Sequence, residues 1–98
     1  MLTSKQRAQL RALGNSLETI FQIGKSGIGE ALISQVSETL EKRELIKLRV
    51  LENSSISSRD AAEEIAKRTE SDVVQVIGSR FILYKESKEN KEIVLVKK

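Results

Sequence analysis

Apolar and polar residues alternate in two stretches of the first half of this chain. Residues 19–23 (TIFQI) and 45–52 (LIKLRVLE) place apolar side chains at every second position, and Lys47 and Arg49 lie between them in the second stretch. A period of two puts successive side chains on opposite faces of an extended chain. Both stretches are therefore predicted to be short strands, the second one half-buried.

Two stretches nearer the C-terminus also have the composition of strands. Residues 73–78 (VVQVIG) and 80–86 (RFILYKE) are rich in β-branched and aromatic side chains and are joined at Gly78 and Ser79. Glycine adopts positive φ without a steric penalty, so this dipeptide predicts a tight hairpin turn. The apolar run 93–96 (IVLV) is expected to add a final edge strand.

Three other segments show apolar residues at helical spacing. The first, 3–15 (TSKQRAQLRALGN), offers Thr3 or Ser4 as an N-cap, and Gly14 is expected to end the helix. The other two helices are predicted over residues 28–45 and 58–70.

The order α-β-α-β-α-β-β predicts an α/β fold of the α+β two-layer kind, in which a mixed four-stranded sheet packs with three helices. At 98 residues the chain has room for one hydrophobic core. We expect one domain over residues 1–98, with its core at about 2–87 and a C-terminal extension at 88–98.

The composition excludes several kinds of chemistry. The chain has no cysteine and no histidine, which removes disulfides, thiolate nucleophiles, the common zinc sites and histidine general bases. We therefore expect no enzyme, no cofactor, no bound metal and no small-molecule substrate. The N-terminus is charged and has no apolar signal-like run, and no long apolar span follows, which predicts a cytoplasmic protein without a membrane partner.

Positive charge is concentrated at the N-terminal end. Residues 1–29 hold Lys5, Arg7, Arg11 and Lys25 against a single acidic residue, which equals the net charge of +3 of the whole chain. Arg7 and Arg11 are four apart and share one face of the first helix. This asymmetry suggests binding to a polyanion, although a solvated helix face is the more common explanation.

A glycine cluster follows the first predicted strand. Gly24, Lys25, Ser26 and Gly27 lie directly before the second helix, where backbone N–H groups and the helix dipole can hold a phosphate. The glycines would equally serve a purely structural turn. The GKS triplet is not a Walker A loop, because the position that needs the first glycine is Thr19, and we reject phosphoryl transfer.

The sequence GKSG is a GxxG loop, the element with which KH domains clamp a single-stranded RNA backbone. In KH domains that loop joins two helices, whereas here it joins a strand to a helix. The pieces LTSKQRAQLR, IGKSGI, ELIKLRVL and VVQVIGSRFILYK, in this order and spacing, resemble instead the CRM domain, the chloroplast RNA splicing and ribosome maturation module. The chain is most similar to single-domain bacterial members of the YhbY type, over about residues 2–87.

This resemblance implies a fold similar to the C-terminal domain of translation initiation factor three and a non-catalytic RNA-binding function. It also implies association with ribosomal RNA in precursors of the large subunit, and in plant relatives with group II introns. By position, Gly24, Lys25, Ser26 and Gly27 would contact RNA, with the basic residues of the first helix beside this loop. We expect a monomer.

Two further expectations concern residues outside the loop. Arg80, next to the predicted hairpin turn, is a weaker candidate for RNA contact. The three aromatic residues, Phe21, Phe81 and Tyr84, lie in apolar strand patterns and are expected in the core rather than on a stacking surface. The alternative to RNA binding is a protein-interaction module that reaches the ribosome through protein contacts and uses the glycine loop only structurally.

Overall fold

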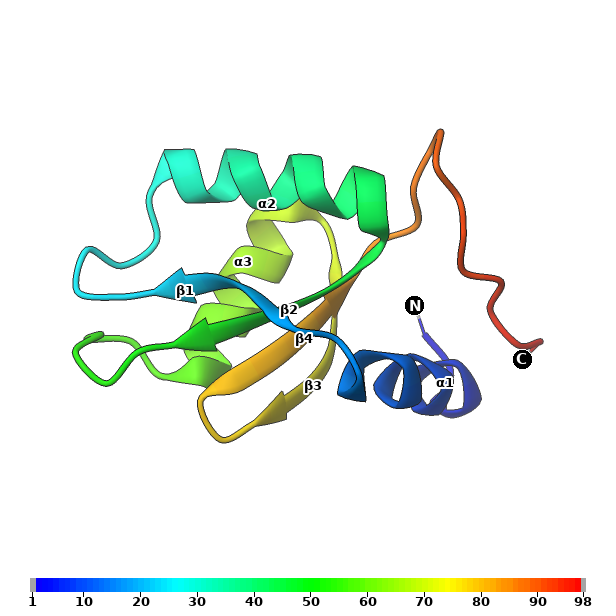
Figure 1. Ribbon diagram of the computed structural model, residues 1–98, viewed down its shortest axis with the longest axis horizontal. Helices are drawn as coiled ribbons and strands as arrows, with labels where there is room; N and C mark the ends of the chain where they lie inside the picture. The colour runs from blue at the N-terminus through cyan, green and yellow to red at the C-terminus, as the bar shows by residue number, and fades with distance from the viewer. Residues whose placement is uncertain (1, 98) are drawn as a thin grey trace.

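The structure is a computed structural model that describes residues 2–97. Three helices and four strands follow one another in the predicted order (Figure 1). Their bounds are α1 Ser4–Asn15, β1 Thr19–Ile23, α2 Glu30–Arg43, β2 Leu45–Val50, α3 Ser58–Thr69, β3 Asp72–Ile77 and β4 Arg80–Tyr84.

The four strands form one mixed sheet in the order β1-β2-β4-β3. β1 and β2 are parallel and are connected through α2, while β2 with β4 and β4 with β3 are antiparallel. The predicted hairpin turn at Gly78 and Ser79 is present, and Gly78 has a φ of 56°. Positive φ at the first turn residue alone is the requirement of a type II′ turn, which explains why glycine stands there.

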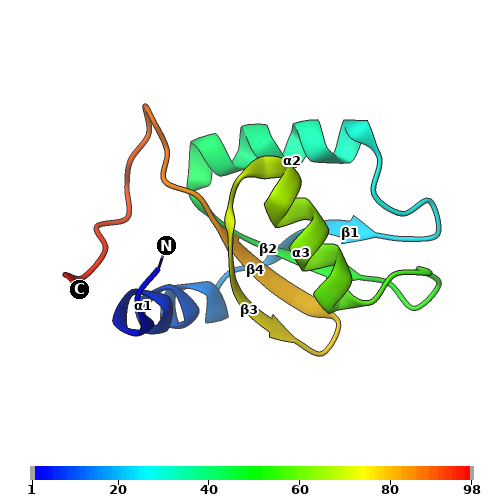
Figure 2. The ribbon, with the colours of Figure 1, turned by 180° about the vertical axis from the view of Figure 1, so that it is seen from behind.

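One face of the sheet is covered by α2 and α3, which lie side by side in Figure 2. The alternation in β2 directs Ile46, Leu48 and Val50 toward these helices, where they join the main hydrophobic core. The same core receives Phe81 and Leu83 from β4. Other buried members come from β1, α2 and α3: Ile23, Val36, Leu40, Ala61, Ala62, Ile65 and Ala66.

The other face of the sheet is covered only at one end, by α1. Leu10 of α1 is fully buried against a second apolar cluster that contains Leu45, Ile82 and Tyr84. Thr3 caps α1 with a capping box, as the sequence suggested. Gly14 does not end the helix, contrary to the prediction. It is buried within α1, where a Cβ would stand 2.6 Å from Ile82 Cδ1, so its role is close packing of the helix on the sheet.

The segment after β4 does not form the predicted edge strand. Residues 85–97, which we call the C-terminal strap, run alongside the end of α2 and across α1 (Figures 1 and 2). Ile93 and Leu95 pack on the second apolar cluster, while the Gln9 side chain bonds the backbone of Val94 and Val96. The alternate apolar side chains of residues 93–96 therefore pack on the cluster beneath α1. The backbone of this segment bonds to the Gln9 side chain instead of to a neighbouring strand.

Two glutamates hold the other half of the strap: Glu41 in the last turn of α2, and Glu44, the residue that follows this helix. Glu44 is fully buried, and its carboxylate accepts the backbone N–H groups of Ser87, Glu92 and Ile93 at 2.7 to 2.8 Å. Glu41 accepts the Ser87 hydroxyl and two further backbone N–H groups of the strap. This arrangement satisfies two carboxylates and several backbone donors at once.

Candidate nucleic-acid interface

The GKSG loop forms a compact turn at the end of β1. The Gly27 N–H donates to Gly24 O at 3.0 Å, which leaves Lys25 and Ser26 exposed at the tip. Gly27 has a φ of 73°, a conformation that other residues rarely adopt, and Gly24 packs near the Leu51 side chain. The turn therefore presents a lysine, a hydroxyl and a backbone bare of side chains at one end of the molecule.

The start of α2 lies two residues beyond this turn. Its N-cap is Gly29, which provides no side-chain hydrogen bond to the first helical N–H groups. Uncapped N–H groups and the positive end of the helix dipole attract anions. Lys25 stands on the same short connection, and the carboxylate of Glu30 in the first turn of α2 is paired with Arg68, so the loop and the helix start can attract an anion.

The predicted neighbourhood of the loop and the first helix is wrong. In Figure 1 the loop lies at the left end of the molecule and α1 at the lower right, with β1 running between them. A strand of five residues spans roughly 16 Å. The basic residues of α1 and Lys25 therefore cannot contact the same nucleotide. The resemblance implied that helix and loop lie beside each other, but the extended strand between them keeps them apart.

The three basic residues of α1 differ in their surroundings. Arg7 donates from its guanidinium to Val73 O and so ties the helix to the edge strand β3. Lys5 is exposed and lies about half a turn away from Leu10, on the side of α1 that faces away from the sheet. Arg11 is partly buried on the same side of the helix as Arg7 and Asn15. Of these three, Arg11 is the one best placed toward the uncovered part of the sheet.

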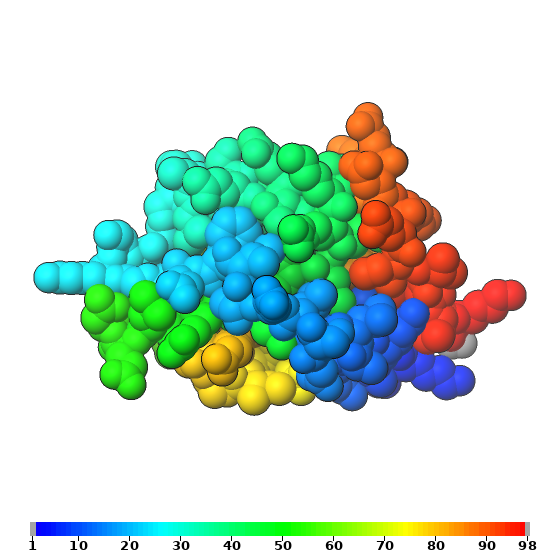
Figure 3. Space-filling model, in the orientation of Figure 1, coloured from blue at the N-terminus to red at the C-terminus, as the bar shows by residue number. Residues whose placement is uncertain are grey.

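The uncovered part of the sheet carries Arg80, which the sequence analysis selected, and two basic residues that it did not select. Lys47 and Arg49 alternate with the core residues of β2 and therefore point to the side of α1. Arg80 of β4 stands directly opposite Arg49 in the antiparallel register. We call the surface of Gln22, Lys47, Arg49, Gln75, Ile77 and Arg80 the open sheet face. Figure 3 shows this side of the molecule, with α1 lying to the right of the strands.

The Arg49 and Arg80 pair has an unusual electrostatic environment. Val50 N–H donates to Ser79 O, so the adjacent Arg49–Arg80 pair is of the non-hydrogen-bonded type, in which side chains lie closest. Like charges directly opposite each other destabilise a sheet. Within residues 2–97, no carboxylate lies within 4 Å of Arg49, Arg80, Lys47 or Lys25. These charges are therefore available to an external anion.

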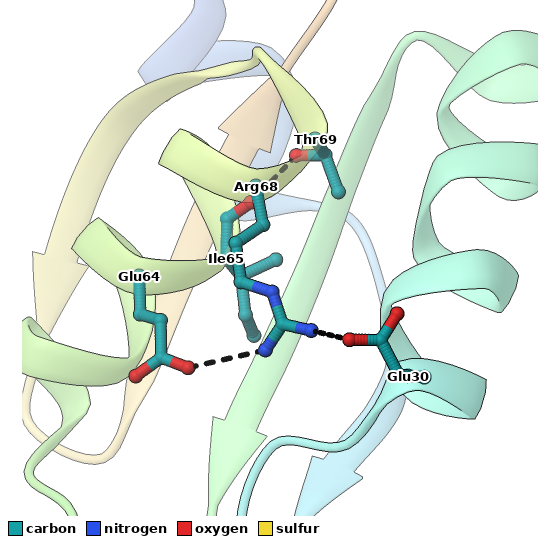
Figure 4. A network of polar contacts seen from close by, with 5 residues as sticks. All are labelled: Glu30, Glu64, Ile65, Arg68 and Thr69. Atoms are coloured by element: carbon teal, nitrogen blue, oxygen red, sulfur yellow. Dashed lines mark hydrogen bonds and ion pairs between the residues drawn. The ribbon is translucent and has the colours of Figure 1, made fainter.

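One arginine on the helix-covered side of the molecule is held in two ion pairs. Arg68 of α3 bonds Glu30 of α2 at 2.6 Å and Glu64 of its own helix at 3.3 Å, as Figure 4 shows. Each partner neutralises part of the charge and fixes the guanidinium between the two helices. The charge of Arg68 is therefore neutralised within the protein, whereas Arg49 and Arg80 of the open sheet face have no such partner.

The aromatic residues lie where the sequence predicted. Phe21 and Phe81 belong to the core between the sheet and α2 with α3, and Tyr84 is buried under α1. Burial raises the pKa of Tyr84, and the carboxylates of Glu44, Glu86 and Asp72 add to this effect. The open sheet face has no aromatic residue among its members, so any base that binds there must stack on apolar or guanidinium groups instead.

The part of the chain that the structure describes contains no group of three or more acidic side chains arranged to hold a metal ion. Over the same residues, no helix has the length and apolar character to cross a lipid bilayer. The chemistry that this surface does offer is recognition of anions by lysine, arginine and backbone N–H groups.

Comparison with known proteins gives consistent relatives. A family model described as the CRS1 / YhbY (CRM) domain matches residues 2–85. The probable RNA-binding protein YqeI of Bacillus subtilis is 50% identical over 95 residues, which cover 97% of this chain and 99% of that protein. An RNA-binding protein of Haemophilus influenzae is 29% identical over 90 residues, or 92% of this chain and 91% of its own length.

A solved structure shows the same fold. A hypothetical protein from Staphylococcus aureus, determined in solution, superposes with a TM-score of 0.81 at 52% sequence identity. The match covers 98% of this chain and all of the other. The mixed four-stranded sheet with three helices is therefore a fold that this chain shares with that protein.

Proposed function

The chain belongs to the CRS1 / YhbY (CRM) domain family, and from this premise we propose that it is a non-catalytic RNA-binding protein. RNA contacts the GKSG loop through its backbone and Lys25, and it continues over the open sheet face. The names of the relatives in Bacillus subtilis and Haemophilus influenzae support the ligand class. The location of the contact is supported by the charges of this chain.

The observation that carries the proposal is the cluster of basic side chains without carboxylate partners at the loop end of the sheet. Lys25, Arg49 and Arg80 lie at the same end of the sheet, since Gln22 pairs with Arg49 only two residues before Gly24, and Arg49 pairs with Arg80. An extended polyanion that follows this surface meets positive charge at each step. Its phosphates would also relieve the repulsion between Arg49 and Arg80.

The alternative is a protein-interaction module in which the glycine loop is only structural. Salt dependence distinguishes the two. Contact of about three phosphates with a single strand gives a slope of roughly −2 in log affinity against log salt concentration. A protein partner would give binding with a weaker response to salt.

We further infer that the RNA is ribosomal and that the protein acts on large-subunit precursors in the cytoplasm as a monomer. The supporting argument is the family to which the chain belongs. A small surface with few basic groups also gains affinity when a folded particle presents several backbone segments at once. Short oligonucleotides are therefore expected to bind more weakly than the assembled particle.

The test uses Lys25→Gln with Lys67→Gln as the matched control. Lys67 is an exposed lysine on α3, behind the sheet, so both changes remove one charge from the surface. We expect Lys25→Gln to bind single-stranded RNA several-fold more weakly and to reduce the salt slope by about 0.7, whereas Lys67→Gln behaves as the native protein. Equal behaviour of the two variants would contradict the loop as a contact.

Sedimentation of a cell lysate tests the finer proposal. The native chain should travel with precursors of the large subunit, and Lys25→Gln combined with Arg80→Gln should remain at the top of the gradient. If the native protein also remains at the top, ribosomal association is wrong. If both proteins travel together with ribosomal particles, protein contacts determine the association.

A further inference from the structure

A small hollow lies on the open sheet face where the end of α1 meets β3 and β4. It has a volume of about 200 Å³ and is lined in part by Asn15, Lys47, Gln75, Ile77, Arg80 and Ile82. Pockets for drug-sized ligands have roughly 300 to 1,000 Å³, so this one suits a smaller planar group. Its wall is mainly apolar, and two cationic side chains stand at its rim.

The register of β3 explains why Gln75 faces this hollow. The pairing of β3 with β4 shifts between Val73 and Gln75, so Val74 is accommodated as an extra residue. Val74 packs on the cluster beneath α1, and Gln75 pairs with Ile82 on the same face. A regular strand would place two adjacent residues on opposite faces. The irregularity therefore places the Gln75 amide next to the apolar side chains of Ile77 and Ile82 in the wall of the hollow.

Two polar atoms of the open sheet face have no partner. Gln75 Oε1 and Arg49 Nε are shielded from solvent and make no hydrogen bond within the described residues. An unsatisfied buried polar group costs about 1 to 3 kcal/mol, so such groups call for an explanation. The terminal torsion of glutamine is soft, so its amide can turn toward a donor in the hollow without breaking an internal hydrogen bond.

We propose that this hollow binds one unstacked base of single-stranded RNA. The Gln75 amide bonds the edge of the base, Ile77 and Ile82 contact its flat face, and Lys47, Arg49 and Arg80 bind the adjoining phosphates. The proposal rests on the RNA-binding function inferred above and adds to it a subsite that recognises a base rather than the backbone.

Charge and composition favour a nucleotide over a peptide at this site. A base carries no charge and suits the apolar wall, while its phosphates suit the three basic side chains around it. Every base presents at least one hydrogen-bond donor on its Watson–Crick edge, which matches the orphan acceptor of Gln75. An acidic peptide would place carboxylates near the basic side chains but would leave the apolar wall and Gln75 without a suitable partner.

The test compares Gln75→Leu with Gln35→Leu. Both remove a glutamine amide, but Gln35 is exposed on α2, which covers the opposite face of the sheet from the hollow. The ligands are a fluorescent RNA strand of about ten nucleotides, within the usual site sizes of single-strand binders, and a strand of equal length without bases. Affinity and salt slope are measured by fluorescence anisotropy, after circular dichroism has verified each fold.

We expect Gln75→Leu to bind the RNA strand about fivefold more weakly or worse, the effect of losing one base contact. Its salt slope should not change, because no phosphate contact is removed. Its affinity for the strand without bases should equal that of the native protein, and Gln35→Leu should match the native protein throughout. In the native protein, the side-chain amide signals of Gln75 should shift in NMR spectra when the RNA strand is added.

Native affinity of Gln75→Leu for the RNA strand, or an equal loss on both strands, would overturn the base subsite while leaving RNA binding by the loop intact. An unchanged Gln75 amide signal in the bound native protein would do the same. If the native protein binds neither strand, the proposed function fails, and the subsite fails with it.

Discussion

The two ends of this molecule differ in whether their charged side chains have partners within the protein. At the strap end, Glu41 and Glu44 are surrounded by backbone N–H groups of residues 87–93, and the more buried of the two carboxylates accepts three of them. At the loop end, Lys25, Arg49 and Arg80 have no carboxylate within 4 Å among residues 2–97. One end satisfies its charges internally, and the other does not.

This difference in partners indicates which charged residues stabilise the fold and which are available for RNA binding. A charge that is fully hydrogen-bonded inside the protein stabilises the fold, because its removal leaves several groups without partners. A charge without an internal partner adds little to the fold and can even oppose it, as the facing arginines do. Such a charge interacts favourably with an external anion. The comparison predicts that substitutions at the strap end change stability alone, and those at the loop end mainly change RNA binding.

The largest expected effect follows from Glu44→Gln. The substitution keeps the size of the side chain but replaces the charge, and one carboxylate oxygen becomes an NH₂ group that faces backbone donors. Hydrogen bonds to charged groups contribute about 1.5 to 3 kcal/mol each, so we expect a loss of about 2 to 3 kcal/mol in the free energy of unfolding. Urea denaturation measures this loss, and RNA affinity at a temperature where the variant is folded should remain native.

The control for this substitution is Glu38→Gln on α2, the helix that Glu44 follows. Glu38 is exposed and makes no ion pair with the described residues, so its replacement should change stability by less than about 0.5 kcal/mol. Equal stability losses for the two variants would show that the strap contributes no more than an ordinary surface segment. Weaker RNA binding by Glu44→Gln would show that the two ends are coupled.

Acid should act on the same end of the molecule. Burial raises the pKa of Glu44, but the N–H groups of Ile93, Ser87 and Glu92 outweigh it, and the pKa lies below its ordinary value of 4.5. The Ser87 hydroxyl and two backbone N–H groups lower the pKa of Glu41. A lowered pKa in the folded state means that the stabilisation is complete above the unfolded pKa and is lost as the pH falls through the folded one.

We therefore expect the native protein to lose stability as the pH falls below about 4.5, with a smaller loss in Glu44→Gln, which has one fewer of these carboxylates. Urea denaturation at pH 7 and about pH 3 compares the two proteins. Identical pH dependence would exclude Glu44 as a source of acid sensitivity.

Much of the fold could be predicted from the sequence because most elements are specified locally. The alternation in β2, the capping box at Thr3 and the Gly78 turn each depend on residues a few positions apart. Gly14 was misjudged because its local signal, a glycine near a helix end, is the same for a C-cap and for close packing. The strap was misjudged because its partners, Glu41 and Glu44, lie more than forty residues away.

The candidate site could be predicted only in part. The GKSG loop is contiguous, so its sequence identifies it. The open sheet face is assembled from four strands, and only their order brings Arg49 opposite Arg80. A local signal for Lys47 and Arg49 did exist, since both occupy the polar side of one strand and both are basic. Gln75 gave no such signal, because its orientation depends on a shift of register.

An effect of intermediate size is expected within the loop itself. Gly27→Ala forces a side chain into a φ of 73°, which costs roughly 1 kcal/mol, whereas an alanine Cβ at Gly24 would lie 3.6 Å from Leu51 Cδ1, an ordinary contact. Thermal unfolding should show a lower melting temperature for Gly27→Ala and a nearly native one for Gly24→Ala. If Gly24→Ala nevertheless weakens RNA binding, close approach of the backbone is the reason. Equal unfolding of both variants would contradict the difference between the two glycines.

The smallest changes in stability, and the sharpest test of the comparison, come from one arginine on each side of the sheet. Arg80→Gln removes one of two facing positive charges, so the free energy of unfolding should rise by a few tenths of a kcal/mol while RNA affinity falls several-fold. Arg68→Gln removes the partner of Glu30 and Glu64, so stability should fall by up to about 1 kcal/mol while RNA affinity is unchanged. Both variants lose the same formal charge, so a general effect of net charge would weaken RNA binding equally in the two. Changes of opposite sign in the free energy of unfolding, together with a loss of RNA affinity confined to Arg80→Gln, would show that a charge paired within the protein stabilises the fold, whereas an unpaired charge serves RNA binding.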